Sequence, residues 1–124
     1  MSAFLAASAA LAAVYAVAQS ASEYDPAAEL TVRGVVTEIH ESKVATDHPG
    51  LHLVLKTETE SVEVHVCPVR FLSELEFTID LGDKLAVLGS RPPGAAVIVA
   101  REIRKGQESL IVRDAKGAPN WLPR

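Results

Sequence analysis

The chain has 124 residues, a net charge of −4 at pH 7, and only one Trp, two Tyr and three Phe. A chain of this length forms one domain, and it can bury a core without a metal ion or a disulfide to hold it together. The acidic balance argues against a surface that follows a phosphate backbone, since the longest basic cluster is the short stretch 101–105.

The first eighteen residues carry no charged side chain and end in Ala16-Val17-Ala18. Small residues at these spacings after an apolar run are typical of a secretory cleavage site. The run is too short and too rich in alanine to span a membrane, which takes about 20 strongly apolar residues. The sequence therefore predicts an export signal over residues 1–18, and a periplasmic or secreted mature protein with no stable membrane anchor. An alanine-rich helix that packs on the domain is the alternative.

Residues 19–29 are small and polar, which predicts a linker before a domain over residues 30–124. Within this domain, six segments have the alternation or the β-branched composition of strands and are bounded by turn residues. One segment, 68–77, has apolar residues at helical spacing and begins with a proline. The predicted strands are 30–40, 51–57, 61–66, 84–90, 95–103 and 109–114.

Three strands, one short helix and then further strands is the element order of the OB-fold, a small Greek-key barrel. The sequence therefore predicts an all-β fold with one short helix, an OB-fold-like five- to six-stranded Greek-key barrel. A small SH3-like barrel, which normally lacks the helix, is the alternative. The predicted core consists of Val35, Ile39, Leu53, Leu55, Val64, Val66, Leu72, Val87, Val99, Ile103 and Ile111.

The second and third predicted strands carry two histidines and the only cysteine of the chain. Their leucines and valines should point into the barrel, which leaves the histidines on the outward face. A turn around residues 59–60 then sets the register of the two strands. It predicts the outward cross-strand pairs His52 with Cys67, Val54 with His65, and Lys56 with Glu63, and it places His40 of the first strand beside His52.

Imidazole and thiolate are ligands that suit copper(I) or zinc. His52, His65 and Cys67 are therefore candidate metal ligands, with His40 nearby, and the position of Cys67 just before the helix would favour a thiolate. A closed site needs a fourth ligand, which is not evident. The prediction is that these residues share a face but form no high-affinity metal site.

OB-folds generally bind ligands on the outer surface of the second and third strands. That face lacks the aromatic rings and the basic groove on which single-stranded nucleic acids bind. No motif of a known catalytic centre is present either, so no enzyme is expected. The leading prediction is a non-enzymatic binding or interaction module for a protein, peptide or small ligand, with copper or zinc binding and oligonucleotide binding as alternatives. The predicted ligand-binding face is made of His40, His52, Val54, Lys56, Glu63 and His65.

The segment 97–121 ends in Leu-x-x-Arg-Asp-x-x-Gly-x-Pro-x-Trp, from Leu110 to Trp121. It resembles the C-terminal half of a group of small exported bacterial proteins with an OB-like barrel, described as uncharacterised or loosely as DNA-binding. The resemblance covers residues 30–121 and implies a fold and a compartment, but no activity. That group has glycine at the position of Cys67, so any role of the thiol would be specific to this chain. We expect Trp121 to pack as a lid over one end of the barrel.

Overall fold

The computed structural model describes residues 24–42 and 50–122. The expected export signal and the first residues of the expected linker lie outside the described residues. Within the described ranges, no helix combines the length and the apolar character needed to cross a membrane.

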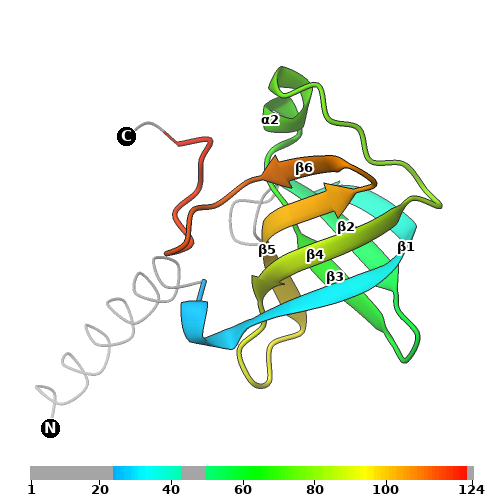
Figure 1. Cartoon of the computed structure of the whole chain (residues 1–124), viewed down its shortest axis with the longest axis vertical. Helices are drawn as coiled ribbons and strands as arrows, with labels where there is room; N and C mark the ends of the chain where they lie inside the picture. The colour runs from blue at the N-terminus through cyan, green and yellow to red at the C-terminus, as the bar shows by residue number, and fades with distance from the viewer. Residues whose placement is uncertain (1–23, 43–49, 123–124) are drawn as a thin grey trace, which may run out of the picture.

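Six strands and one short α-helix follow one another in the described part of the chain (Figure 1). The predicted order of three strands, a helix and three further strands is confirmed. A single 3-10 turn precedes the first strand. The elements are η1 (Pro26–Ala28), β1 (Glu29–Ser42), β2 (Gly50–Lys56), β3 (Ser61–His65), α2 (Val69–Glu74), β4 (Lys84–Ser90), β5 (Val97–Lys105) and β6 (Glu108–Ile111).

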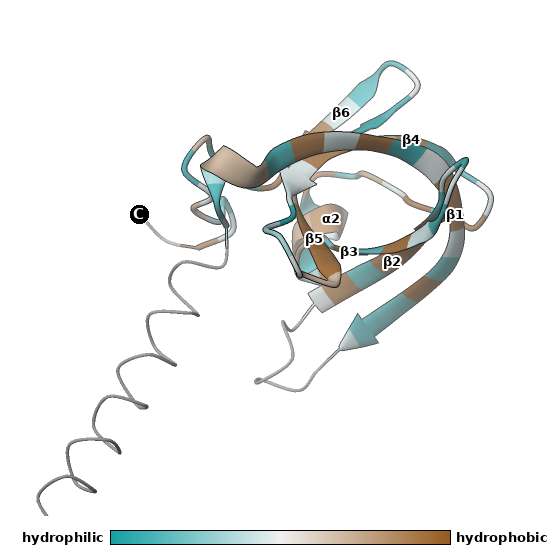
Figure 2. Cartoon of the chain, turned by 90° about the horizontal axis from the view of Figure 1, so that it is seen from below, coloured by the Kyte–Doolittle hydropathy of each residue, from teal (hydrophilic) through white to brown (hydrophobic). Residues whose placement is uncertain are grey.

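Five of these strands close into a ring. The sheet runs β3-β2-β1-β4-β5-β6, and a parallel pairing between β3 and β5 joins its two sides. Viewed from below, the strands enclose the core, and α2 is seen through the ring at its far end (Figure 2). The prediction of an all-β, OB-fold-like arrangement is thereby confirmed, with β6 added outside the ring as a short edge strand.

Strand β1 is shared by two neighbours and changes face at a β-bulge. Val36 pairs with Leu55 of β2, whereas Glu38 pairs with Val54, so Thr37 is the extra residue. A bulge reverses the inward and outward sides along a strand. Before the bulge Val36 points into the core, and after it Ile39 does. The prediction that Val35 is a core residue is therefore wrong, because it assumed unbroken alternation back from Ile39.

The core fills the ring with aliphatic side chains from all six strands and from α2. Most of the predicted core residues belong to it, and Ile39 packs against it from a partly buried position. In β6 the inward residue is Leu110, which pairs with Ile103, whereas Ile111 is exposed. The core assignment of Ile111 is thus wrong by one position, because a four-residue edge strand is too short for its alternation to fix its face.

The C-terminal motif folds back over the barrel. Arg113 is buried, and its Nη1 atom donates hydrogen bonds to the backbone carbonyls of Val66 and Ala100. Its guanidinium group lies 4.9 Å from the centre of the Trp121 ring, and that ring lies 5.9 Å from the ring of Phe71 in α2. Trp121 therefore packs against the helix end of the core, as expected.

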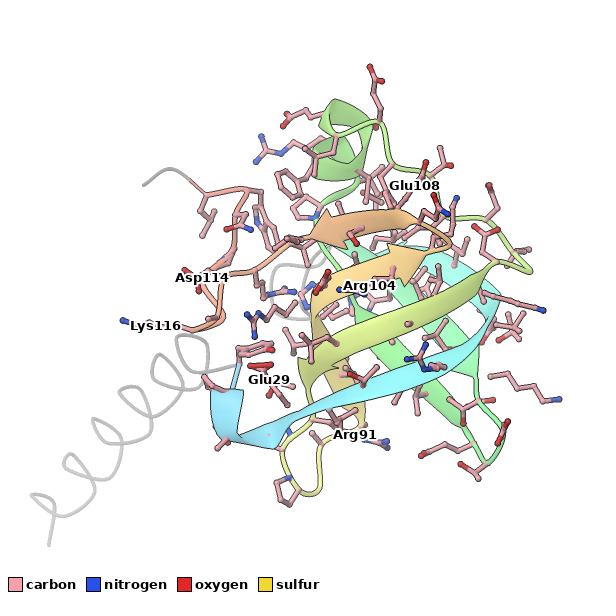
Figure 3. The ribbon with its side chains drawn as sticks, viewed as in Figure 1. Glu29, Arg91, Arg104, Glu108, Asp114 and Lys116 are labelled. Atoms are coloured by element: carbon pink, nitrogen blue, oxygen red, sulfur yellow. The ribbon has the colours of Figure 1, made fainter. Side chains whose placement is uncertain are left out.

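The loop between Arg113 and Trp121 is held by Asp114. Its Oδ1 atom accepts hydrogen bonds of 2.9 Å from the backbone amides of Lys116 and Ala118. Asp114 and Lys116 are labelled in this loop in Figure 3. The loop packs against Tyr24, which is buried. The folded region therefore starts before residue 30, inside the segment that was expected to be a linker.

The contact between this loop and Tyr24 requires glycine at position 117. A Cβ atom on Gly117 would lie 2.3 Å from the Cβ atom of Tyr24, and Gly117 has a φ of +90°. We expect Gly117→Ala to lower the free energy of unfolding by about 2 kcal/mol or more, since a positive φ alone costs about 1–2 kcal/mol for a non-glycine residue.

Gly94→Ala is the matched control in urea denaturation. Gly94 has a similar φ of +82°, but a Cβ atom there would meet nothing within 4 Å. It should therefore report the backbone cost alone. Equal losses in the two variants would contradict the proposed packing of the loop on Tyr24.

Candidate functional site

Three histidines from three neighbouring strands stack on one another. His40 pairs with His52 across β1 and β2, and His52 pairs with His65 across β2 and β3. The ring centres of His40 and His52 are 5.3 Å apart, those of His52 and His65 are 4.8 Å apart, and the planes are tilted by only 11° and 18°. The predicted neighbourhood of His40 and His52 is present, and His65 continues the row.

The three rings differ in exposure, and one carboxylate lies beside two of them. His52 and His65 are only 5% and 4% exposed, whereas half of the His40 side chain is accessible. An oxygen of Glu63 lies 3.6 Å from Nε2 of His40, and its other oxygen lies 3.8 Å from Nδ1 of His52. The carboxylate can therefore balance a positive charge on either ring. As a docking surface, however, this end of the predicted face offers little beyond His40 and Glu63.

The register of β2 and β3 differs from the prediction by two residues. His52 faces His65, Val54 faces Glu63 and Lys56 faces Ser61. The reason is a tight turn, in which the Thr57 amide donates to the Glu60 carbonyl and the Thr57 hydroxyl accepts from two amides of the turn. A shift by two residues keeps every side chain on its face, so leucines still lie opposite valines.

Cys67 does not belong to the histidine row. Strand β3 ends at His65, and Cys67 is fully buried within the hydrophobic core. The prediction that Cys67 lies outward and faces His52 is wrong, because the chain leaves the strand before alternation can carry the thiol to that side. Burial raises the pKa of the Cys67 thiol to about 12, although the nearby charge of Arg113 lowers it. The expected thiolate at the helix start is therefore not supported.

The stacked rings are poorly arranged to bind a common metal ion. Imidazole ligands coordinate through nitrogen lone pairs that lie in the ring plane, and nearly parallel rings direct these lone pairs side by side rather than to one point. Among the residues that the structure describes, no group of three or more His, Cys, Asp or Glu side chains is placed to hold a metal ion. Of the three candidate ligands, His52 and His65 lie side by side, whereas the Cys67 thiol is buried in the core, away from them.

We expect the thiol of Cys67 to be unreactive in the folded protein. With a pKa of about 12, on the order of one thiol in ten thousand is ionised at pH 8, and the thiolate is the reactive form. Reaction with a chromogenic disulfide reagent at pH 8 should be at least ~100-fold slower in the native protein than in urea. Comparable rates in the two states would show that the thiol is accessible and ionised.

A hollow lies on the outer side of β1, away from the stacked rings. It has a volume of about 1010 Å³ and is lined by residues of β1, β2, β4 and β5 and of the turns that follow β2 and β5. Lys56 is the one residue of the predicted ligand-binding face that lines it. We call this hollow the β1 groove.

Four basic side chains line the β1 groove: Arg33, Lys56, Lys84 and Arg104. Arg104, labelled in Figure 3, has an acidic partner. Its Nε atom lies 3.3 Å from an oxygen of Glu102. Within the described residues, the other three form no ion pair. This cluster could not be predicted from the sequence, because each strand supplies one cation and no basic run appears along the chain. The cations come together only through the pairing of β1 with β2 and β4.

A model of the MamS/MamX magnetosome protein family matches residues 28–110. The chain belongs to this family. The MamS/MamX match covers all of the ring-forming strands, and it confirms that the chain is a member of a bacterial protein family. It ends at residue 110, so it does not extend to the Arg-Asp-x-x-Gly-x-Pro-x-Trp motif.

Two further comparisons add little to this family assignment. No curated protein matches the chain. Among solved structures, the chain is similar to the crystal structure of the ZRD-deleted mutant of TiaS in complex with agmatine, with 20% sequence identity and a TM-score of 0.48. That match covers 67% of this chain and 24% of the other, so this MamS/MamX family member spans about a quarter of the TiaS chain.

Proposed function

We propose that this protein is a non-catalytic binding module of the bacterial cell envelope, and that its partner docks in the β1 groove. The observation that carries the proposal is the groove itself, about 1010 Å³ in volume, with three cations that have no acidic partner among the described residues. Cations that are already neutralised contribute little to recognition, whereas unpaired ones steer and orient a charged partner.

The chemistry of the remaining titratable groups favours binding over catalysis. A nucleophilic cysteine needs an ionised thiol close to a base, and Cys67 is buried, with a pKa raised to about 12 by that burial. The histidines stack on each other and beside Glu63, and their row lies outside the β1 groove. Neither arrangement places a nucleophilic cysteine or a histidine base in the β1 groove.

Export of the mature protein is the second part of this proposal. It rests on the uncharged apolar start and on Ala16-Val17-Ala18. Intact-mass measurement on the protein from the periplasm of a native host tests it. The expected mass is that of a chain beginning at Gln19, and a soluble cytoplasmic protein that retains Met1 would contradict it.

The two alternative functions have weaker support. A copper or zinc site would need lone pairs that converge, and the stacked rings of His40, His52 and His65 do not provide them. An oligonucleotide site would need aromatic stacking platforms, and the residues that line the β1 groove include no aromatic ring.

Site-specific photo-crosslinking in living cells tests the docking site. A photoreactive amino acid placed at Thr31, an exposed residue that lines the groove, should give a discrete crosslinked product. The same amino acid at Glu74, exposed on α2 outside the groove, should not. Products of equal yield from both positions, or from Glu74 alone, would contradict docking in the β1 groove.

A further inference from the structure

The strand register arranges the groove side chains in rows. Residues directly opposite each other in an antiparallel pair point to the same side of the sheet. Val35 of β1 pairs with Lys56 on one side and with Lys84 on the other, which gives one row across three strands. Arg33 pairs with Ala86, and Ala86 pairs with Arg104, which gives the next row. The four cations therefore occupy two adjacent rows of one face.

The spacing of these rows matches an extended polypeptide. Neighbouring rows on one face are two residues apart along a strand, which is about 6.8 Å. Acidic side chains at alternate positions of an extended segment have the same spacing. A carboxylate opposite Arg33 and a second one opposite Lys56 or Lys84 would thus be in register with the groove.

The β1 groove is positively charged, whereas the whole protein has a net negative charge. The chain has 16 acidic and 12 basic residues, yet four cations and only two acids, Glu58 and Glu102, line the groove. Three cations outside the groove are paired with acids: Arg91 with Glu60, Arg101 with Glu29 and Lys105 with Asp83. Arg33, Lys56 and Lys84 remain available to a partner, and carboxylates are strong acceptors for such donors.

The apolar residues of the groove favour a peptide over a nucleic acid. Val35 and Ala86 lie between the cations of the two rows, and Leu88 lies in the next row along β4, which gives an apolar floor on which the stems of long basic side chains and a peptide backbone can rest. No ring among the lining residues can stack on a base, as binding of a single-stranded nucleic acid requires.

We propose that the β1 groove binds an extended acidic segment of a partner protein, with carboxylates at alternate positions. This inference rests on the proposed function, because it names the chemical class of the partner that docks there. Arg33, Lys56 and Lys84 contact the carboxylates, and Ala86 and Leu88 contact the remainder of the segment.

Fluorescence anisotropy with a labelled peptide of alternating Glu and Ser tests this proposal. The intact domain should bind it, and binding should weaken as salt is raised, since the contacts are between exposed charges. The same peptide with Gln in place of Glu should not bind. A Lys56→Gln, Lys84→Gln double variant should bind the acidic peptide at least ~10-fold more weakly, because two of the three cations that contact the carboxylates are lost.

The matched control removes two exposed cations outside the groove. An Arg70→Gln, Lys116→Gln double variant has the same net charge as the groove variant, and neither residue lines the groove. It should change affinity less than about two-fold, since distant charges are screened. A cooperative thermal unfolding transition in each variant would show that both variants fold. Equal weakening in the two double variants, binding of the Gln peptide, or tighter binding of a single-stranded oligonucleotide would overturn the acidic-segment proposal.

The outcomes separate this inference from the proposed function. If the acidic peptide does not bind but crosslinking from Thr31 persists, the partner is not acidic while the β1 groove remains the docking site. If neither is observed, both proposals are wrong.

Discussion

Replacing Leu53 with alanine is expected to lower the free energy of unfolding by about 2 to 5 kcal/mol. Leu53 is fully buried, and it pairs with Ile39 on β1 and Val64 on β3 at the centre of the ring. Removing its side chain leaves a cavity that three hydrogen-bonded strands cannot close by moving together.

Leu81→Ala is the control in the same denaturation experiment. Leu81 is 65% exposed, so its truncation removes a similar volume with little change in packing and should cost less than about 0.5 kcal/mol. A loss below about 0.5 kcal/mol for Leu53→Ala would mean that the inward and outward faces of β2 are reversed.

Replacing Arg113 with methionine is expected to cost a further large share of stability, about 2 to 5 kcal/mol. Arg113 is only 2% exposed, and its guanidinium group donates to the carbonyls of Val66 and Ala100. Methionine keeps much of the apolar stem but supplies no donor, so these carbonyls lose a charged partner. The packing of Trp121 on the guanidinium group is lost as well.

Arg70→Met separates this effect from the general loss of a positive charge. Arg70 is exposed on α2, and its replacement should change the free energy of unfolding by less than about 0.5 kcal/mol. Near-UV circular dichroism of Trp121 gives a second readout, because the indole signal depends on fixed packing. An unchanged Trp121 signal together with unchanged stability in Arg113→Met would contradict the structural role of Arg113.

The fold could be predicted from sequence where alternation is long and uninterrupted. In β2 and β3 the leucines and valines alternate over enough residues to fix their faces, and the inward positions of Leu53, Leu55 and Val64 were correct. In β1 the sequence gives no sign of the bulge at Thr37, since Val35 and Val36 are equally apolar. The bulge depends on how β1 meets two neighbours, and single-strand patterns do not contain that information.

The candidate site was also hard to predict where it depends on pairing between strands that are far apart in the chain. The pairing of His40 with His52 was predicted from the faces of adjacent strands, but the predicted row continued to Cys67. His65 takes that place, because the turn at Thr57 shifts the register by two residues. The β1 groove is different, because its cations come from strands far apart in the chain. The closure of β1 between β2 and β4 brings Lys56 and Lys84 to the two sides of Val35. No local pattern around either lysine predicts this.

The most direct test of docking in the β1 groove is a titration of the ¹⁵N-labelled domain with the alternating Glu-Ser peptide, followed by two-dimensional NMR. We predict that the backbone amides of Arg33, Lys56, Lys84 and Ala86 shift together with one dissociation constant, while those of His40 and Glu63 do not. Shifts centred on His40 and Glu63, or on α2, with the amides around Val35 unchanged, would contradict docking in the β1 groove.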